Sequence, residues 1–76
     1  MSVVIYSSEH CGPCCQLKKY LKYKGIAFVD KDIEEPENRT AVKNLSGQCI
    51  VPVAVIDDNV VVGYNLQRIN SLLGIN

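Results

Sequence analysis

Three of the four cysteines in the chain lie within five positions, in the segment EHCGPCC at residues 9–15. The same segment contains His10, the only histidine. Cysteine thiols at this density are suited to three kinds of chemistry: disulfide exchange, metal binding or a structural cross-link. If Cys11 and Cys14 lie at the start of a helix, the second sulfur is one turn beyond the first, and the pair can close a small disulfide ring.

The composition of the chain argues against structural disulfides and against two classes of partner. The 76 residues are 47% hydrophobic, which predicts one small domain over 1–76 with enough apolar surface to fold without cross-links. The apolar run at residues 3–6 is too short for a signal peptide, so we expect a cytoplasmic protein with reduced thiols. The formal net charge is zero, which favours neither nucleic acid nor an anionic membrane surface as a partner.

The chain alternates strand and helix patterns, and these must position the cysteines. Short β-branched runs and polar turns predict strands at 3–6, 26–33, 52–56 and 60–62. Apolar spacing with Pro, Asn and Gly at the ends predicts helices at 13–24, 34–46 and 66–73. The order is βαβ followed by ββα. We therefore expect an α/β fold, a four-stranded mixed sheet with three helices on both faces.

The Cys11–Cys14 motif falls where the first strand ends and the first helix begins. Pro13 fits the first helical turn, where its missing N–H is no loss. The free N–H groups and the positive end of the helix dipole would favour the Cys11 thiolate and lower its pKa. Because the thiolate is the attacking species in disulfide exchange, this placement indicates redox chemistry. A Cys-X-X-Cys motif in a βαβ context is typical of thioredoxin-like proteins.

The segments VVIYSSEHCGPCCQLKKYLKYKGI, SGQCIVPVAVIDDNVVVGYN and INSLLGI give the chain an end-to-end resemblance to the glutaredoxins, and more widely to the thioredoxin-like fold. Among them it looks closest to short bacterial glutaredoxin-like proteins. The resemblance implies that Cys11 is the nucleophile and Cys14 the resolving thiol. It implies that Pro52 is a cis-proline and that Val51 offers backbone groups to a peptide or glutathione. The substrate-binding residues it suggests are Gly12, Pro13, Val51, Pro52, Gly63, Tyr64 and Asn65.

Several positions depart from the usual glutaredoxin pattern. Ser8 stands where many glutaredoxins have lysine, Gly12-Pro13 replaces Pro-Tyr, and Ile50 replaces threonine. Val62-Gly63 followed by Asn65 replaces Gly-Gly and an acidic residue. Each change removes a charge or polar contact that would hold glutathione. The resemblance therefore leaves two electron sources open, thioredoxin reductase and glutathione. We expect a monomer with no bound cofactor that reduces a disulfide in a protein or small molecule.

Other chemistry at the same segment is also possible. The main alternative is a metal- or iron–sulfur-binding module that uses Cys11, Cys14 and Cys15, with His10 as a further ligand. Three ligands within five residues do not match the separated pairs of a structural zinc site, so we expect no metal site.

The remaining cysteines and three further side chains allow more than one reading. Cys15 and Cys49 are either small apolar fillers or additional redox thiols. His10 is either solvated or a proton shuttle. Lys18 either belongs to a solvated face or adds positive potential near Cys11. Tyr64 either packs or contacts substrate.

Overall fold

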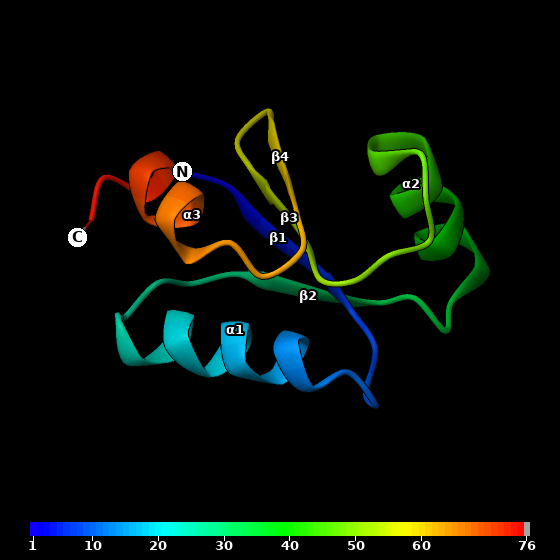
Figure 1. The fold of residues 1–76 in the computed structure, drawn as a ribbon, viewed down its shortest axis with the longest axis horizontal. Helices are drawn as coiled ribbons and strands as arrows, with labels where there is room; N and C mark the ends of the chain where they lie inside the picture. Colours follow the sequence, from blue (N-terminus) through cyan, green and yellow to red (C-terminus); the bar gives the residue numbers. More distant parts are fainter. Residues whose placement is uncertain (76) are drawn as a thin grey trace.

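The computed structural model describes residues 1–75 and has the predicted mixed sheet (Figure 1). Along residues 1–75 the elements are β1 (Val3–Ser7), α1 (Gly12–Tyr23), β2 (Val29–Asp32), α2 (Pro36–Ser46), β3 (Val53–Ile56), β4 (Asn59–Val62) and α3 (Leu66–Leu73). The strand order is β2-β1-β3-β4. β1 runs parallel to β2 and antiparallel to β3, and β3 and β4 form an antiparallel hairpin. This confirms the predicted four-stranded mixed sheet of the thioredoxin-like type, and the sheet is open.

The helices cover the two faces of the sheet unequally, with α1 and α3 on one face and α2 on the other (Figure 1). Side chains alternate along each strand, so Ile5 points toward α1 and α3 while Tyr6 points toward α2. The larger core cluster contains Val3, Ile5, Leu17, Leu21, Ala54, Ile56, Val61, Ile69 and Leu73. The smaller cluster contains Tyr6, Val42 and Val53. The predicted placement of helices on both faces is therefore confirmed.

Helix α1, which carries the cysteines, is held at both ends and along its length. Leu17 and Leu21, one turn apart, are completely buried against the sheet. The helix ends in a Schellman motif, in which the N–H of Ile26 donates to the Leu21 carbonyl at 2.9 Å and Gly25 adopts a φ of +72°. The Tyr20 hydroxyl donates to the side-chain oxygen of Asn70 at 2.7 Å and ties α1 to α3. The start of α1 is thus fixed relative to the sheet.

The second strand is shorter than the sequence predicts. Residues 26–33 were expected to be extended, but β2 spans only Val29–Asp32 and all of its residues are exposed. The Schellman hydrogen bond holds Ile26 in the helix-ending turn, and Ile26 and Phe28 pack against the larger core cluster from the connecting loop. Ile26 and Phe28, the apolar residues that suggested a long strand, therefore pack against the core from a loop outside the sheet.

Other predicted boundaries hold within one or two residues. β3 begins at Val53 rather than at Pro52, which has no N–H to give to a ladder. Helix α2 ends at Gly47 as predicted, but of its expected apolar face only Val42 is fully buried, and Leu45 is 40% exposed. Asn65 caps α3, and Gly74 follows its last turn with a φ of +75°. None of the helices within residues 1–75 has the length and apolar character needed to cross a membrane.

Candidate disulfide redox site

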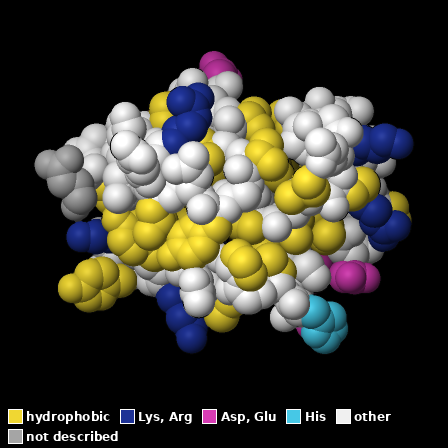
Figure 2. Space-filling model, viewed as in Figure 1, with side chains coloured by type: hydrophobic (Ala, Val, Ile, Leu, Met, Phe, Trp, Pro, Cys, Tyr) yellow, Lys and Arg dark blue, Asp and Glu magenta, His cyan; other side chains and the backbone are white. Residues whose placement is uncertain are grey.

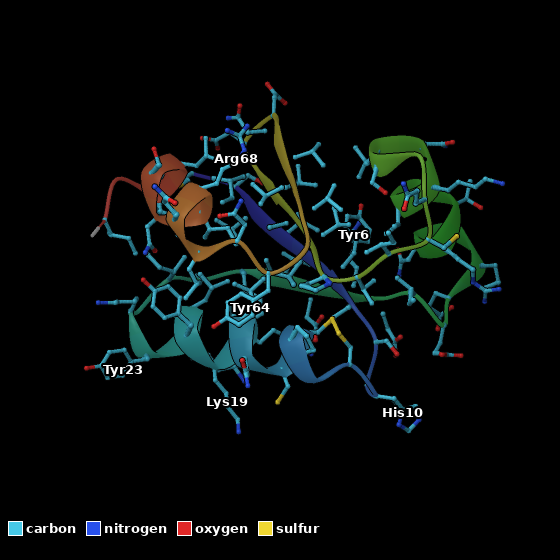
Figure 3. The ribbon with its side chains drawn as sticks, in the orientation of Figure 1. Tyr6, His10, Lys19, Tyr23, Tyr64 and Arg68 are labelled. Carbon is cyan, nitrogen blue, oxygen red and sulfur yellow. A yellow bond between two sulfur atoms is a disulfide. The ribbon has the colours of Figure 1, made fainter. Side chains whose placement is uncertain are left out.

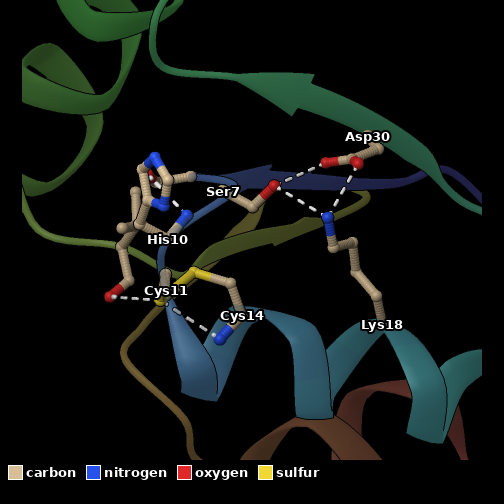
Figure 4. Close-up of a disulfide and its surroundings, with 8 residues drawn as sticks. Ser7, His10, Cys11, Cys14, Lys18 and Asp30 are labelled. Carbon is tan, nitrogen blue, oxygen red and sulfur yellow. Dashed lines mark hydrogen bonds and ion pairs between the residues drawn. A yellow bond between two sulfur atoms is a disulfide. The ribbon is translucent and has the colours of Figure 1, made fainter.

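Cys11 is the N-cap residue of α1, and it forms a disulfide with Cys14 (Figure 4). Its backbone is extended, with φ −101° and ψ 112°, and the helix begins at Gly12. The backbone N–H of Cys14 points at the Cys11 sulfur across 3.2 Å, the contact that an N-cap side chain normally makes. In the reduced protein this N–H and the helix dipole would stabilise a Cys11 thiolate. Pro13 lies in the first turn, as predicted.

The two sulfurs of the pair differ in access to solvent. Cys14 is completely buried, whereas Cys11 is partly exposed and is followed by the exposed residues Gly12 and Pro13. Apart from the adjacent residues and the backbone of α1 itself, no atom lies within 4 Å of the Cβ position of Gly12, so the approach over this residue is open. A second molecule can therefore reach Cys11 and not Cys14.

The loop before β3 closes the other side of the disulfide. The peptide bond between Val51 and Pro52 is cis, and the carbonyl oxygen of Val51 lies 3.9 Å from the Cys11 sulfur. A Cys11 thiol could donate to this oxygen. The N–H of Gly63 donates to the Pro52 carbonyl at 2.8 Å, which brings the residues after β4 to the same loop. Two segments far apart in the sequence thus meet beside the disulfide.

Tyr64 and Asn65 lie on the segment that Gly63 anchors. Tyr64 is 40% exposed, so it is available to a bound molecule, and it projects toward α1 in Figure 3. The Asn65 side-chain oxygen accepts a hydrogen bond from the N–H of Arg68 at 3.2 Å and caps α3. Asn65 also lines a shallow pocket of about 280 Å³ with Gln67, Arg68 and Ser71.

Apolar side chains are exposed along the loops that border the site. Ile50 precedes Val51, and Val62 precedes Gly63; with Tyr64 they are each at least 40% exposed. In the view of Figure 2, hydrophobic side chains form a band across this face while the charged side chains lie mainly around its margin. The loops beside the disulfide therefore expose apolar rather than charged side chains at these three positions.

A partly buried hydrogen-bonded network lies on the α1 face of the sheet, and it was not predicted (Figure 4). Ser7, the last residue of β1, is 3% exposed and donates its hydroxyl to Asp30 at 2.7 Å. Lys18, four residues after Cys14, donates to Asp30 at 2.9 Å and to the Ser7 hydroxyl at 3.3 Å. The sequence signal was the spacing of Cys14 and Lys18 on one helix face; nothing local links Lys18 to Ser7 or Asp30. Lys18 is therefore paired, which argues against a simple solvated face.

The network changes the pKa of Asp30. Partial burial alone would raise this pKa above its ordinary value of 3.8. The hydrogen bonds from Ser7 and Lys18, together with the positive charges of Lys18 and Lys22, outweigh the burial and lower the pKa. Asp30 is consequently a carboxylate at neutral pH and carries a full negative charge beside the Lys18 ammonium.

The remaining candidates are less closely associated with the disulfide. Among residues 1–75, Cys15 and Cys49 are the free cysteines, and both are exposed. Cys49 lines a pocket of about 280 Å³ with the α2 side chains Arg39 and Lys43. The His10 side chain is 88% exposed and 3.9 Å from Glu9, which fits the solvated reading. Tyr6 is buried in the smaller core cluster with Val42 and Val53 and therefore packs rather than facing the disulfide loops.

Metal binding finds no geometric support in residues 1–75, where no group of three or more His, Cys, Asp or Glu side chains is arranged to hold a metal ion. Two of the proposed ligands, Cys11 and Cys14, are joined to each other, and Cys15 faces outward. The arrangement is instead a disulfide at the N-terminus of a helix.

Comparison with known proteins agrees with this geometry. The glutaredoxin family model matches residues 3–61. An uncharacterized glutaredoxin-like 8.6 kDa protein in the rubredoxin operon of Clostridium pasteurianum is 40% identical over 72 residues, which cover 93% of this chain and 96% of that protein.

Two solved structures show the same fold over nearly the whole chain. The glutaredoxin grx-1 from Archaeoglobus fulgidus is 29% identical, with a TM-score of 0.85 over 95% of this chain and 85% of that one. The glutaredoxin-like protein NrdH-redoxin from Escherichia coli, described as having a thioredoxin-like activity profile, is 25% identical, with a TM-score of 0.85 over 95% of each chain. The chain therefore belongs to the glutaredoxin family and has the thioredoxin-like fold of its thiol–disulfide oxidoreductases, with a disulfide between Cys11 and Cys14.

Proposed function

We propose that the protein is a dithiol electron carrier in which Cys11 attacks substrate disulfides and Cys14 resolves the resulting mixed disulfide. The observation that carries this proposal is the unequal exposure of the two bonded sulfurs. Cys11 is partly exposed at the positive end of α1, while Cys14 is completely buried. An exposed thiolate can reach a second molecule, and a buried thiol one turn away can reach only Cys11.

The proposed cycle transfers two electrons and two protons to the substrate. The Cys11 thiolate attacks one sulfur of the substrate disulfide, forms a new sulfur–sulfur bond and displaces the other sulfur, which takes up a proton. Cys14 then loses its proton and attacks the Cys11 sulfur. The second substrate thiol leaves, and the Cys11–Cys14 disulfide is restored. A reductant returns the two electrons and two protons before the next turnover.

The substrate would lie over Cys11, between the two loops that meet there. Val51 precedes β3 and could pair its backbone with an extended peptide, as in β-strand addition. Gly12 and Pro13 would form the open side of the site, and Pro52 would support the disulfide. Gly63, Tyr64 and Asn65 would contact the substrate from the segment after β4. Exposed Ile50 and Val62 favour a protein substrate with an apolar contact surface.

The proposed electron source is a thioredoxin reductase, and glutathione is the alternative. Ser8, Ile50 and Asn65 stand where glutaredoxins have residues that hold glutathione, and Ile50 and Val62 expose apolar surface on the bordering loops. The Escherichia coli relative with a thioredoxin-like activity profile is consistent with this choice. The proposed compartment is the cytoplasm, where a reductase keeps thiols reduced, and the proposed active form is a monomer.

A coupled NADPH-oxidation assay on the disulfide form tests the electron source. The protein is supplied with a model protein disulfide such as insulin, once with thioredoxin reductase and once with glutathione plus glutathione reductase. We expect measurable turnover with the first and slow or no turnover with the second. Fast turnover that depends on glutathione would overturn the choice of reductant. The absence of turnover with either system and with dithiothreitol would overturn the carrier function itself.

A Cys14→Ser variant tests the assigned roles within the pair. It should accumulate a mixed disulfide between Cys11 and the substrate, because the resolving thiol is missing, and mass spectrometry of the conjugate identifies the bonded residue. Cys11→Ser is the matched control and should trap nothing. A conjugate through Cys14 in that control would reverse the assignment.

A further inference from the structure

Three polar side chains in the surroundings of the disulfide take no part in the proposed exchange steps. Ser7, Asp30 and Lys18 come from β1, β2 and α1, and they form a closed ring of hydrogen bonds (Figure 4). Ser7 is almost fully buried, the Lys18 side chain is 24% exposed and the Asp30 side chain is 45% exposed. Holding three polar groups here costs conformational and desolvation free energy that an apolar cluster would not require.

The position of Lys18 relates the network to the disulfide. Lys18 follows Cys14 by four residues, so both side chains lie on the same face of α1, one turn apart. Ser7 is joined to the Cys11 region by a short connection, in which the N–H of Cys11 donates to the Ser8 carbonyl at 3.2 Å. An uncompensated ammonium at this position would add to the helix dipole and favour the reduced, thiolate form of the pair.

The ammonium of Lys18 is compensated. Its Nζ lies 2.9 Å from an Asp30 carboxylate oxygen, and the Ser7 hydroxyl fixes the other oxygen of the same carboxylate. The two charges form a dipole with no net charge, whose effect falls off faster with distance than that of a single charge. Lys18 is thereby prevented from strengthening the attraction for a Cys11 thiolate.

We propose that Asp30 is a positioning residue that cancels the charge of Lys18 and so keeps the Cys11–Cys14 pair strongly reducing. The inference rests on the proposed function of the pair as an electron carrier. A free cation near a dithiol stabilises its thiolate, which makes the disulfide easier to reduce and the dithiol a weaker reductant of other disulfides. By holding the Lys18 ammonium, Asp30 leaves the N-terminus of α1 as the main source of positive potential at Cys11.

The proposal assigns opposite effects to the two partners. Asp30→Asn leaves the Lys18 ammonium unpaired and should favour the reduced form. Lys18→Gln leaves the Asp30 carboxylate unpaired and should favour the disulfide. The double variant removes both charges and should lie close to the wild type. Loss of packing alone would move both single variants in the same direction, so the signs separate charge from structure.

The experiment measures the equilibrium between the protein disulfide and dithiothreitol at neutral pH, in which one dithiol is oxidised as the other disulfide is reduced. For charges one or two helical turns apart near a protein surface, we expect a shift of roughly threefold to tenfold in the equilibrium constant. Asp30→Asn should shift the equilibrium toward the reduced protein, and Lys18→Gln should shift it toward the protein disulfide. Thiolate absorbance during a pH titration should show Cys11 ionising at lower pH in Asp30→Asn and at higher pH in Lys18→Gln.

Two matched controls carry the same changes of charge outside the ring. Asp32→Asn lies two residues along β2, and Lys22→Gln lies one turn along α1; neither side chain hydrogen-bonds within the network. We expect each to shift the equilibrium by less than its partner inside the ring. Equal shifts in a control and its partner would attribute the effect to general surface charge and overturn the proposal.

Two other outcomes would also overturn the proposal: single variants that shift in the same direction, or a double variant as far from the wild type as either single. If Asp30→Asn fails to fold, Lys18→Gln and Lys22→Gln still give the sign and its control. The equilibrium requires neither substrate nor reductase. A carrier that fails the coupled assay can still show these shifts, so the two proposals fail separately.

Discussion

The two faces of the sheet differ in how deeply they are packed and in what their thiols can do. Within residues 1–75, nine buried residues form the cluster beneath α1 and α3, whereas three form the cluster beneath α2. The first face carries Cys14, which is completely buried, whereas Cys49 is exposed in the connection between α2 and β3. Deep packing thus coincides with the helix that must hold a disulfide in place.

The N-termini of the helices also differ between the two faces. Helices α1 and α3 each begin with a residue whose side chain accepts a backbone N–H, Cys11 and Asn65. Helix α2 begins after Glu35, whose side chain makes no such bond, and its residue Leu45 remains 40% exposed. On the α1 and α3 face, the helices are capped and deeply packed, which fixes their positions on the sheet. On the α2 face, the helix lacks a side-chain cap and covers a smaller buried cluster. Three predictions test this comparison.

The largest expected effect separates the thiols of the two faces. Cys11→Ser should lower disulfide-reducing turnover to the uncatalysed background, because the attacking thiolate is lost. Cys49→Ser, the matched change on the α2 side, should leave turnover unchanged, and so should Cys15→Ser on the surface of α1. Turnover is measured in the assay with dithiothreitol or reductase as electron source. A marked change in Cys49→Ser would instead support the reading of Cys49 as an additional redox thiol.

The second prediction compares the packing of the two helices. Leu17→Ala should lower the free energy of unfolding by about 3 kcal/mol, because it opens a cavity in the larger cluster. Val42→Ala removes less volume from the smaller cluster and should cost about 2 kcal/mol. Denaturant unfolding of both variants gives the two values.

A second measurement on the same variants connects packing to the site. Alkylation of Cys14 in the folded, reduced protein should become faster in Leu17→Ala, because Leu17 lies one turn from Cys14 on the buried side of α1. It should not change in Val42→Ala. Equal acceleration in both would show that the two faces are not independent in protecting the resolving thiol.

The smallest effect concerns the acid stability contributed by Asp30. Its pKa is lowered in the folded protein, so its contribution to stability is present above the ordinary value of 3.8 and is lost as the pH falls through the lower folded value. Because the carboxylate is partly exposed, solvent screening keeps this contribution below about 1 kcal/mol. Asp30→Asn should therefore lose less stability than the wild type between neutral pH and the acid transition.

Thermal unfolding across this pH range measures the difference. Glu37→Gln, the same change of charge on the α2 face, is the control and should follow the wild-type pH dependence. If Asp30→Asn and the wild type lost stability in parallel, the network would not hold Asp30 in its charged form.

The sequence identified the elements whose signals are local. Cys11 and Cys14 at the start of a helix, the cap at Asn65 and the turns at Gly47 and Gly74 depend on residues within about one turn of each other, and the structure confirms each placement. The predicted length of the second strand was wrong, because Ile26 is held in the Schellman turn after α1 and cannot be part of an extended strand. That competition depends on hydrogen bonds to the preceding helix and not on β propensity.

The sequence by itself determined the chemistry of this protein: an N-cap thiol, a second thiol one turn later, and alternating strands and helices to carry them. Only the tertiary structure decided which groups meet that pair. Val51 faces the Cys11 sulfur from forty residues away, and Ser7 and Asp30 join Lys18 across two strands and a helix. The reason is physical, since helix starts and caps are set by neighbours along the chain, whereas contacts between distant segments depend on how the whole core packs.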